Sequence, residues 1–261
     1  MCTTCGCGRP GDEPEAGDHG HDHGREGKRP GEHSHDDALH GIVRVEQALL
    51  AENDRHAAYV RGFFAGMGIR SFNLISAPGS GKTTLLERTL SALLARGRKC
   101  SVVEGDQQTD LDARRIATTG APVRQIQTGK ACHLDAHQIR HALEHLSPER
   151  GSLVFVENVG NLICPTEFDL GESERVVLLS VTEGTDKPAK YPLAFRTATS
   201  VVLCKTDLLP HVDFDVEESL RLIRGLNPGA HLFLLSARTG EGMEPWLRWV
   251  AGDGGGTPAR P

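Results

Sequence analysis

The fold is decided by Ser76-Ala77-Pro78-Gly79-Ser80-Gly81-Lys82-Thr83-Thr84, which follows an apolar run and opens a helical pattern. This stretch matches the phosphate-loop pattern GxxxxGK(S/T), except that Ser76 occupies the first glycine position. The glycines let backbone N–H groups turn toward phosphates at a helix N-terminus, and Lys82 adds a positive charge. The Thr83 hydroxyl can ligate Mg²⁺. An incidental glycine-rich turn is the alternative. The order of strand, loop and helix favours a phosphate-binding loop over residues 78–84.

Along the rest of the chain, short apolar runs alternate with helical stretches such as Thr83–Arg96 and Leu134–Leu146. The runs are Phe72–Ser76, Cys100–Glu104, Val123–Thr128, Leu153–Val159, Val176–Val181, Val201–Cys204 and His231–Ser236. Continuous apolar runs are typical of parallel strands that are covered on both faces. The pattern predicts an α/β fold, a P-loop NTPase with a mostly parallel, about seven-stranded sheet flanked by helices.

The remaining segments predict the domain organisation. Residues 1–40 lack apolar periodicity and are expected to form a disordered, metal-binding tail rich in Cys and His. Residues 41–70 are expected to form a helical segment packed on the nucleotide domain, with Asn53-Asp54 marking a break. The nucleotide domain is expected over residues 71–250, and a flexible tail over residues 251–261.

Composition narrows the classes of function. The net charge of −6 argues against a nucleic-acid partner, which would favour a basic excess. No apolar run approaches the roughly 20 residues of a membrane span, and the N-terminus lacks the apolar region of a secretory signal. We therefore expect a cytoplasmic protein whose seven cysteines are reduced thiols or metal ligands.

Two later motifs indicate the base of the nucleotide. Cys204-Lys205-Thr206-Asp207 resembles the guanine-reading pattern NKxD, in which Asp accepts from the base and Lys packs along it. Cys204 replaces the Asn. Ser236-Ala237-Arg238 resembles the loop whose backbone N–H meets guanine O6. Together they favour GTP over ATP, with Lys205, Asp207, Ser236 and Ala237 as base-binding residues. A helix N-cap is the alternative role for Asp207.

Acidic residues at two strand ends are candidates for the catalytic region. Glu157-Asn158-Val159-Gly160 lies where a GTPase places DxxG, an acid near Mg²⁺ and a glycine N–H near the γ-phosphate. Asp106 is a second acidic candidate, expected to ligate Mg²⁺ with Thr83. The predicted catalytic residues are Lys82, Thr83, Asp106, Glu157 and Gly160.

Clusters of thiols and imidazoles indicate a softer metal ion. Cys2, Cys5 and Cys7 can wrap one ion, because thiolates favour Ni(II), Zn(II) and Cu(I) over hard cations. A chance thiol cluster is the alternative. The histidine-rich segment 19–40 favours metal buffering over a solvated spacer.

A second set of soft ligands lies inside the nucleotide domain. Cys132-His133 and Cys164 each follow a predicted strand end, so they are expected at one sheet edge with the phosphate loop. Buried structural cysteines are the alternative. Further histidines recur every four residues, at 137, 141 and 145, and are interpreted as a polar outer stripe.

Together these motifs resemble the hydrogenase nickel-incorporation GTPases, the HypB family. The stretches that carry the resemblance are Cys2–Cys7, Pro78–Thr84, Gly129–Asp135, Glu157–Pro165 and Asp186–Pro192. The resemblance implies a GTPase of the signal-recognition-particle/MinD/BioD class (SIMIBI), which converts GTP and water to GDP and phosphate and dimerises with GTP bound. It assigns Cys2, Cys5 and Cys7 to a high-affinity nickel site, and Cys132, His133 and Cys164 to a nickel or zinc site.

The resemblance also implies a task and partners. Nickel would pass to the [NiFe]-hydrogenase large subunit precursor, with a small HypA-type metallochaperone as partner. One alternative is a nickel storage protein with a vestigial nucleotide site. Another is a urease accessory GTPase, whose expected Cys-Pro-His motif does not occur in the sequence. The expected mechanism is a switch, in which GTP and Mg²⁺ order the loops that carry the internal metal ligands.

Overall fold

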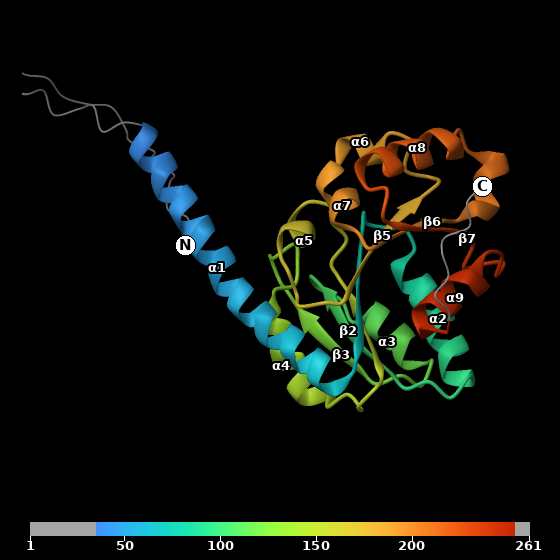
Figure 1. Ribbon diagram of the computed structural model, residues 1–261, viewed down its shortest axis with the longest axis horizontal. Coiled ribbons are helices and arrows are strands. Elements are labelled where there is room, and N and C mark those ends of the chain that lie inside the picture. Colours follow the sequence, from blue (N-terminus) through green and yellow to red (C-terminus); the bar gives the residue numbers. More distant parts are fainter. Residues whose placement is uncertain (1–34, 254–261) are drawn as a thin grey trace, which may run out of the picture. The chain divides into compact units, whose positions relative to one another are not determined.

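The computed structural model describes residues 35–253, with side chains from residue 47 onward. These residues form a seven-stranded sheet in the order β3-β2-β4-β1-β5-β6-β7, and every neighbouring pair is parallel (Figure 1). The strands are β1 Arg70–Ser76, β2 Cys100–Asp106, β3 Val123–Gln127, β4 Leu153–Glu157, β5 Glu174–Ser180, β6 Ser200–Cys204 and β7 His231–Leu235. All seven predicted strands are therefore confirmed, with ends that differ by one or two residues.

Helices connect the strands and cover the sheet. They are α1 His35–Met67, α2 Lys82–Ala95, α3 Leu111–Ala117, α4 Ala136–Leu146, α5 Cys164–Glu167, α6 Lys187–Lys190, α7 Pro192–Thr197, α8 Val216–Leu226 and α9 Met243–Ala251, with a 3₁₀ helix η1 at Thr206–His211. The predicted α/β class with a mostly parallel sheet is confirmed.

Alternate residues of the central strands supply the cores on the two faces of the sheet. Phe155 packs with α2 and α9 in one core, whereas its neighbours Val154 and Val156 pack with α1 and α4 on the other face. Farther along the sheet, Val177 and Leu179 pack with α7 and α8. Both faces are thus buried, which explains why the strands are continuously apolar.

The predicted break at Asn53-Asp54 is wrong, because α1 runs through it without interruption. Asn53 is buried, and its side chain serves other segments: Oδ1 accepts from Ala136 N at 2.9 Å and Nδ2 donates to Asp169 O at 2.8 Å. A polar residue that suggested a helix end is instead a bridge from α1 to two loops.

The start of α4 also differs from the prediction, which placed it at Leu134. Asp135 is the N-cap: its carboxylate accepts from Gln138 N, and the Gln138 side chain accepts from Asp135 N. This capping box stabilises a helix that begins at Ala136 and leaves His133 in the preceding loop. The loop therefore carries His133 at the carboxyl edge of the sheet.

Candidate nucleotide and metal sites

The phosphate loop joins β1 to α2 through two glycines with left-handed backbone angles. Gly79 has φ 72° and Gly81 has φ 107°, values that favour glycine strongly over other residues. Lys82 is buried at the start of α2, and its Nζ donates to Ser76 Oγ at 3.0 Å. Burial lowers the Lys82 pKa, opposed mainly by the nearby Glu157 carboxylate. Ser76, the departure from the usual glycine, thus holds the lysine beside the loop.

The strand-end acid Glu157 lies against the phosphate loop. Thr83 Oγ1 donates to Glu157 Oε1 at 2.6 Å, while Glu157 Oε2 is buried with no hydrogen-bond partner among residues 35–253. Burial raises the Glu157 pKa to about 7, opposed by the Thr83 hydrogen bond and by Lys82. A hydroxyl and an unsatisfied carboxylate oxygen are a donor set that suits a hard cation such as Mg²⁺.

Gly160 brings the next loop close to the phosphate loop. A Cβ at this position would lie 2.9 Å from Pro78 Cα, so any side chain would force the two backbones apart. The structure therefore places Lys82, Thr83, Glu157 and Gly160, four of the five predicted catalytic residues, around one loop.

Asp106, the fifth, has a local role in the structure. Its Oδ1 accepts from Gln108 N at 2.8 Å and from Thr109 N at 2.7 Å, so the carboxylate shapes the turn after β2. Sequence reasoning missed Glu104, which is buried and pairs in register with Glu157 across β2 and β4. Burial and then the Glu157 charge raise the Glu104 pKa to about 8. A carboxylate inside an apolar run was the signal for it.

The predicted base-binding residues line one cavity of about 180 Å³. Lys205, at φ 61°, donates from Nζ to Gly79 O at 2.7 Å. Asp207 Oδ1 accepts from Ser236 Oγ at 2.6 Å, and Ala237 lines the same cavity. The helix-cap alternative for Asp207 is wrong, because Lys205 is the N-cap of η1 and no side chain caps that helix.

Cys204 lies beneath the phosphate loop instead of the usual asparagine. The buried Sγ donates to Ser80 O at 3.0 Å and lies 3.4 Å from Leu179 O. Burial raises the Cys204 pKa to about 12, so the group is a neutral thiol and a hydrogen-bond donor. This position therefore still supports the phosphate loop with a hydrogen bond.

Cys132, His133 and Cys164 come together from two loops at the carboxyl edge of the sheet. Their ligand atoms all lie within 4.8 Å of one another, and Cys132 Sγ is 3.8 Å from His133 Nδ1. Burial lowers the His133 pKa, which favours the neutral, ligating imidazole. A hydrogen bond with Cys132 is the main cause of the raised Cys164 pKa. Both thiols are only half-buried, in contrast to Cys100 and Cys204, and with His133 they suit a borderline-soft ion.

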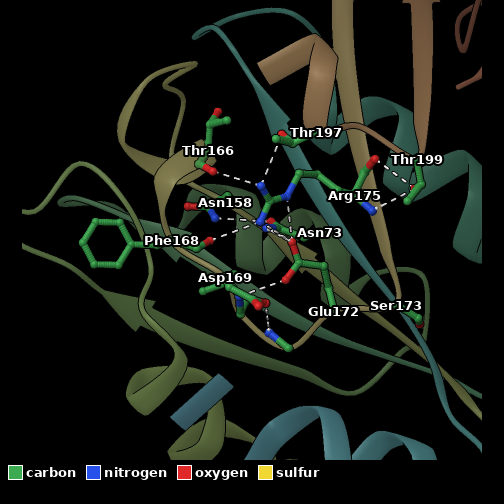
Figure 2. A network of polar contacts seen from close by, with 12 residues as sticks. Asn73, Asn158, Thr166, Phe168, Asp169, Glu172, Ser173, Arg175, Thr197 and Thr199 are labelled. Atoms are coloured by element: carbon green, nitrogen blue, oxygen red, sulfur yellow. Dashed lines mark hydrogen bonds and ion pairs between the residues drawn. The ribbon is translucent and has the colours of Figure 1, made fainter. Parts of the chain in front are cut away.

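Asn158, which follows Glu157, connects the nucleotide acid to the metal loop. Its Oδ1 accepts from Leu134 N at 3.1 Å, directly after His133, and its Nδ2 donates to Asn73 Oδ1 at 3.2 Å (Figure 2). Asn73 Nδ2 in turn donates to Glu172 Oε1 at 3.3 Å. Asn158 belongs to the Glu157–Gly160 motif, but its contact with the backbone of Leu134 depends on the tertiary fold and could not be predicted from the sequence.

The same polar network holds the second metal loop. Arg175 pairs with Glu172, whose Oε1 accepts from Arg175 Nε at 2.9 Å (Figure 2). Arg175 also donates to Thr166 O at 2.9 Å and to Phe168 O at 3.4 Å, just after Cys164. One buried network therefore positions the loops that carry both halves of the metal cluster.

Comparison with known proteins identifies the family. The model of the CobW/HypB/UreG nucleotide-binding domain matches residues 71–233. A hydrogenase maturation factor HypB from Azotobacter vinelandii is 55% identical over 209 residues, covering 80% of this chain and 69% of the relative. HypB from Rhizobium leguminosarum bv. viciae is 46% identical, covering 96% of this chain and 95% of the relative. The chain belongs to the HypB family of hydrogenase maturation factors.

Solved HypB structures share the fold. HypB from Helicobacter pylori in complex with nickel is 38% identical with a TM-score of 0.73, covering 77% of this chain and 94% of that chain. HypB from Archaeoglobus fulgidus is 41% identical with a TM-score of 0.73, covering 78% and 99%. The resemblance to HypB predicted from sequence is confirmed.

One prediction about this HypB chain concerns a segment that the structure does not describe. Cys2, Cys5, Cys7 and the start of the histidine-rich segment lie outside the described residues, so the terminal metal site stays a prediction. Within residues 35–253, no helix has the length and apolar character needed to cross a membrane.

Proposed function

We propose that this chain is a GTP-hydrolysing nickel metallochaperone that delivers nickel to the [NiFe]-hydrogenase large subunit precursor. The main support for the proposal is the position of Asn158 between the nucleotide site and the metal cluster. Its backbone continues from Glu157, which accepts from Thr83 of the phosphate loop, and its side chain accepts from Leu134 N beside His133. A nucleotide site and a cluster of soft ligands thus share one strand end.

In the nucleotide site, the phosphate loop would surround the phosphates. Its residues are Pro78, Gly79, Ser80 and Gly81, followed by Lys82, Thr83 and Thr84 in the first turn of α2. Asp207 and Lys205 would read guanine, with Ser236 and Ala237 closing the base cavity. Thr83, with Glu157 or Asp106, would hold Mg²⁺, which neutralises charge on the β- and γ-phosphates. Lys82 would turn from Ser76 toward the phosphate oxygens, and the Gly160 N–H would meet the γ-phosphate.

In the metal cluster, Cys132, His133 and Cys164 would bind nickel or zinc as cargo, leaving room for a further ligand. Cys2, Cys5 and Cys7 would form a separate nickel site. Nucleotide state would act through Asn158, because movement of β4's end with GTP shifts the Leu134 backbone and so the spacing of the ligands.

The proposal also covers the oligomeric state, the partner protein and the cellular location. We expect a homodimer with GTP bound, a HypA-type metallochaperone as partner, and a cytoplasmic location. Lys187, on α6, lies close to the phosphate loop: its Nζ is 3.7 Å from Glu183 Oε2, and Glu183 Oε1 accepts from Ser80 Oγ.

The test combines turnover with metal titration. GTP turnover is expected in the full chain and is expected to be lost in Lys82→Ala, whereas Lys99→Ala at an exposed position should retain it. Nickel and zinc titrations with GTP, GDP and no nucleotide should give different affinities for the Cys132/His133/Cys164 cluster. Bound metal without GTP turnover would favour storage instead, and identical metal affinities and oligomer sizes in all three states would exclude the switch.

A further inference from the structure

A cavity of about 520 Å³ lies on the side of the metal cluster that faces α1 and α4. His133 lines this cavity together with Glu52, His56 and His137. Its ring also packs against Phe168, with 3.9 Å between ring centroids. Since His133 Nδ1 points toward Cys132 Sγ, one imidazole borders both the thiol pair and the cavity.

The part of the cavity wall that α1 forms carries a carboxylate and an imidazole on one turn of the helix. Glu52 and His56 are four residues apart and share a helical face. Glu52 Oε1 lies 3.4 Å from His56 Nε2. Two ligand atoms on a tetrahedral ion with bonds of about 2.1 Å are separated by about 3.4 Å, so the spacing suits a shared metal ion.

His137 adds a second imidazole from α4. Its ring centroid is 4.9 Å from that of His56 at an interplanar angle of 66°. The exposed His137 side chain can rotate toward His56 and Glu52, since exposed rotamers exchange rapidly. Asn53 fixes the two helices at this distance, because its side chain binds Ala136 N directly before His137.

We propose that Glu52, His56 and His137 form an entry site for a divalent transition-metal ion, which then passes to His133 and the thiolates of Cys132 and Cys164. The transfer is a ligand exchange: bonds to imidazole and carboxylate break, bonds to sulfur and His133 form, and the thiols release their protons to water. No electron is transferred. This reassigns His137 from the polar stripe, and the proposal rests on the metal role proposed above for the cluster.

The ligand chemistry of the two sites differs in a measurable way. Thiolates give nickel a charge-transfer absorption, whereas imidazole and carboxylate do not. In the full chain with Cys2→Ser, Cys5→Ser and Cys7→Ser, the band reports arrival at Cys132 and Cys164. Cys100 and Cys204 are buried, with their pKa values raised to about 11 and about 12, so they stay protonated and silent.

The test compares two double variants of this parent. His56→Ala/His137→Ala removes the entry site, and His141→Ala/His145→Ala removes a pair of imidazoles with centroids 5.2 Å apart elsewhere on α4. Limiting nickel is supplied from a weak chelator. We expect the thiolate site of His56→Ala/His137→Ala to fill about tenfold more slowly than that of the control variant, because the high local metal concentration beside His133 is lost. Its final band should equal that of the control.

The outcomes separate this proposal from the function proposed above. Equal loading rates in the two double variants would overturn the entry site while leaving the thiolate site intact. Absence of the band in the parent would overturn the metal role of the cluster, and the entry site with it.

A second measurement does not depend on transfer. In the full chain with Cys132→Ser and Cys164→Ser, excess cobalt(II) should shift or broaden the amide signals of Glu52, His56 and His137. Unchanged signals there, or the same changes after His56→Ala/His137→Ala, would overturn the site.

Discussion

The Thr83 hydroxyl donates to the Glu157 carboxylate at 2.6 Å, which joins the first turn of α2 to the end of β4. Both residues belong to strand or helix ends whose positions are fixed by the sheet. The second Glu157 oxygen is buried without a hydrogen-bond partner in the described part of the chain. Such an oxygen carries a desolvation cost that a bound cation would remove.

Glu157→Gln is therefore expected to weaken Mg²⁺ binding by about 10- to 100-fold while nucleotide binding without Mg²⁺ stays close to the parent. An amide retains the hydrogen bond from Thr83 but lacks the charge that attracts the ion. Titration of Mg²⁺ into the complex with a fluorescent GDP measures the effect. Glu149→Gln, at an exposed position, is the matched control. Equal Mg²⁺ affinity in both variants would exclude Glu157 from the magnesium site.

The buried pair Glu104 and Glu157 predicts a pH dependence of the metal-free, nucleotide-free protein. Burial raises the Glu104 pKa from 4.5 to about 8, so the folded state keeps a proton that the unfolded state releases above about pH 4.5. The unfolded state then binds fewer protons, and the free energy of unfolding falls as pH rises from 5 to 8. We expect a decrease on the order of 2 kcal/mol, measured by urea denaturation.

Glu104→Gln separates this effect from other titrations. The amide cannot ionise, so the variant should lose the part of the decrease that Glu104 causes and be more stable than the parent at pH 8. The part caused by Glu157, whose pKa is raised to about 7, should remain. A variant whose stability falls with pH as steeply as that of the parent would show that Glu104 is not the titrating group.

The sheet could be predicted from sequence because each strand is apolar on both faces. Phe155 and Val156 face different cores, and only a doubly covered parallel sheet needs that pattern. The phosphate loop followed for a similar reason, since Gly79 and Gly81 adopt backbone angles that favour glycine. Local chemistry alone therefore predicted the fold and the position of the phosphate loop.

The polar residues that join segments could not be predicted in the same way. Asn53 suggests a helix end, yet its side-chain amide connects α1 to Ala136 and Asp169. These residues are 83 and 116 positions farther along the chain. Asn158 connects β4 to Leu134 and Asn73, and both contacts depend on strand order. Sequence shows that such side chains are polar, but their partners are set by the tertiary fold.

We expect the preference for guanine over other bases to depend on the Asp207 carboxylate. Asp207→Asn is expected to weaken GDP binding by at least about tenfold, because the carboxylate that accepts from guanine N1 and N2 is replaced by an amide. Xanthosine diphosphate, which carries an oxygen in place of the N2 amine, should bind the variant better than the parent. Competition against a fluorescent nucleotide measures both. Asp213→Asn is an exposed control, and unchanged GDP affinity in Asp207→Asn would place the base elsewhere.

Cys204 should support nucleotide binding through the phosphate loop. Cys204→Ala removes the thiol that donates to Ser80 O, and we expect a loss of stability of about 1 kcal/mol with a small loss in GDP affinity. Cys204→Ser restores a donor and should recover most of the affinity. Denaturation and nucleotide titration measure the two effects. A Ser variant as weak as the Ala variant would show that the hydrogen bond has no role.

The Arg175 network should position the metal cluster as well as stabilise the fold. Arg175→Met leaves the buried Glu172 carboxylate unpaired and is expected to cost about 3 kcal/mol. It also frees the carbonyls of Thr166 and Phe168 beside Cys164, so nickel affinity at the cluster should fall by about 10- to 100-fold. In the double variant Arg175→Met/Glu172→Gln the stranded charge is gone, and much of the stability should return. The carbonyls remain unheld, so nickel affinity should stay low. Recovery of metal affinity in step with stability would reduce the network to a purely structural role.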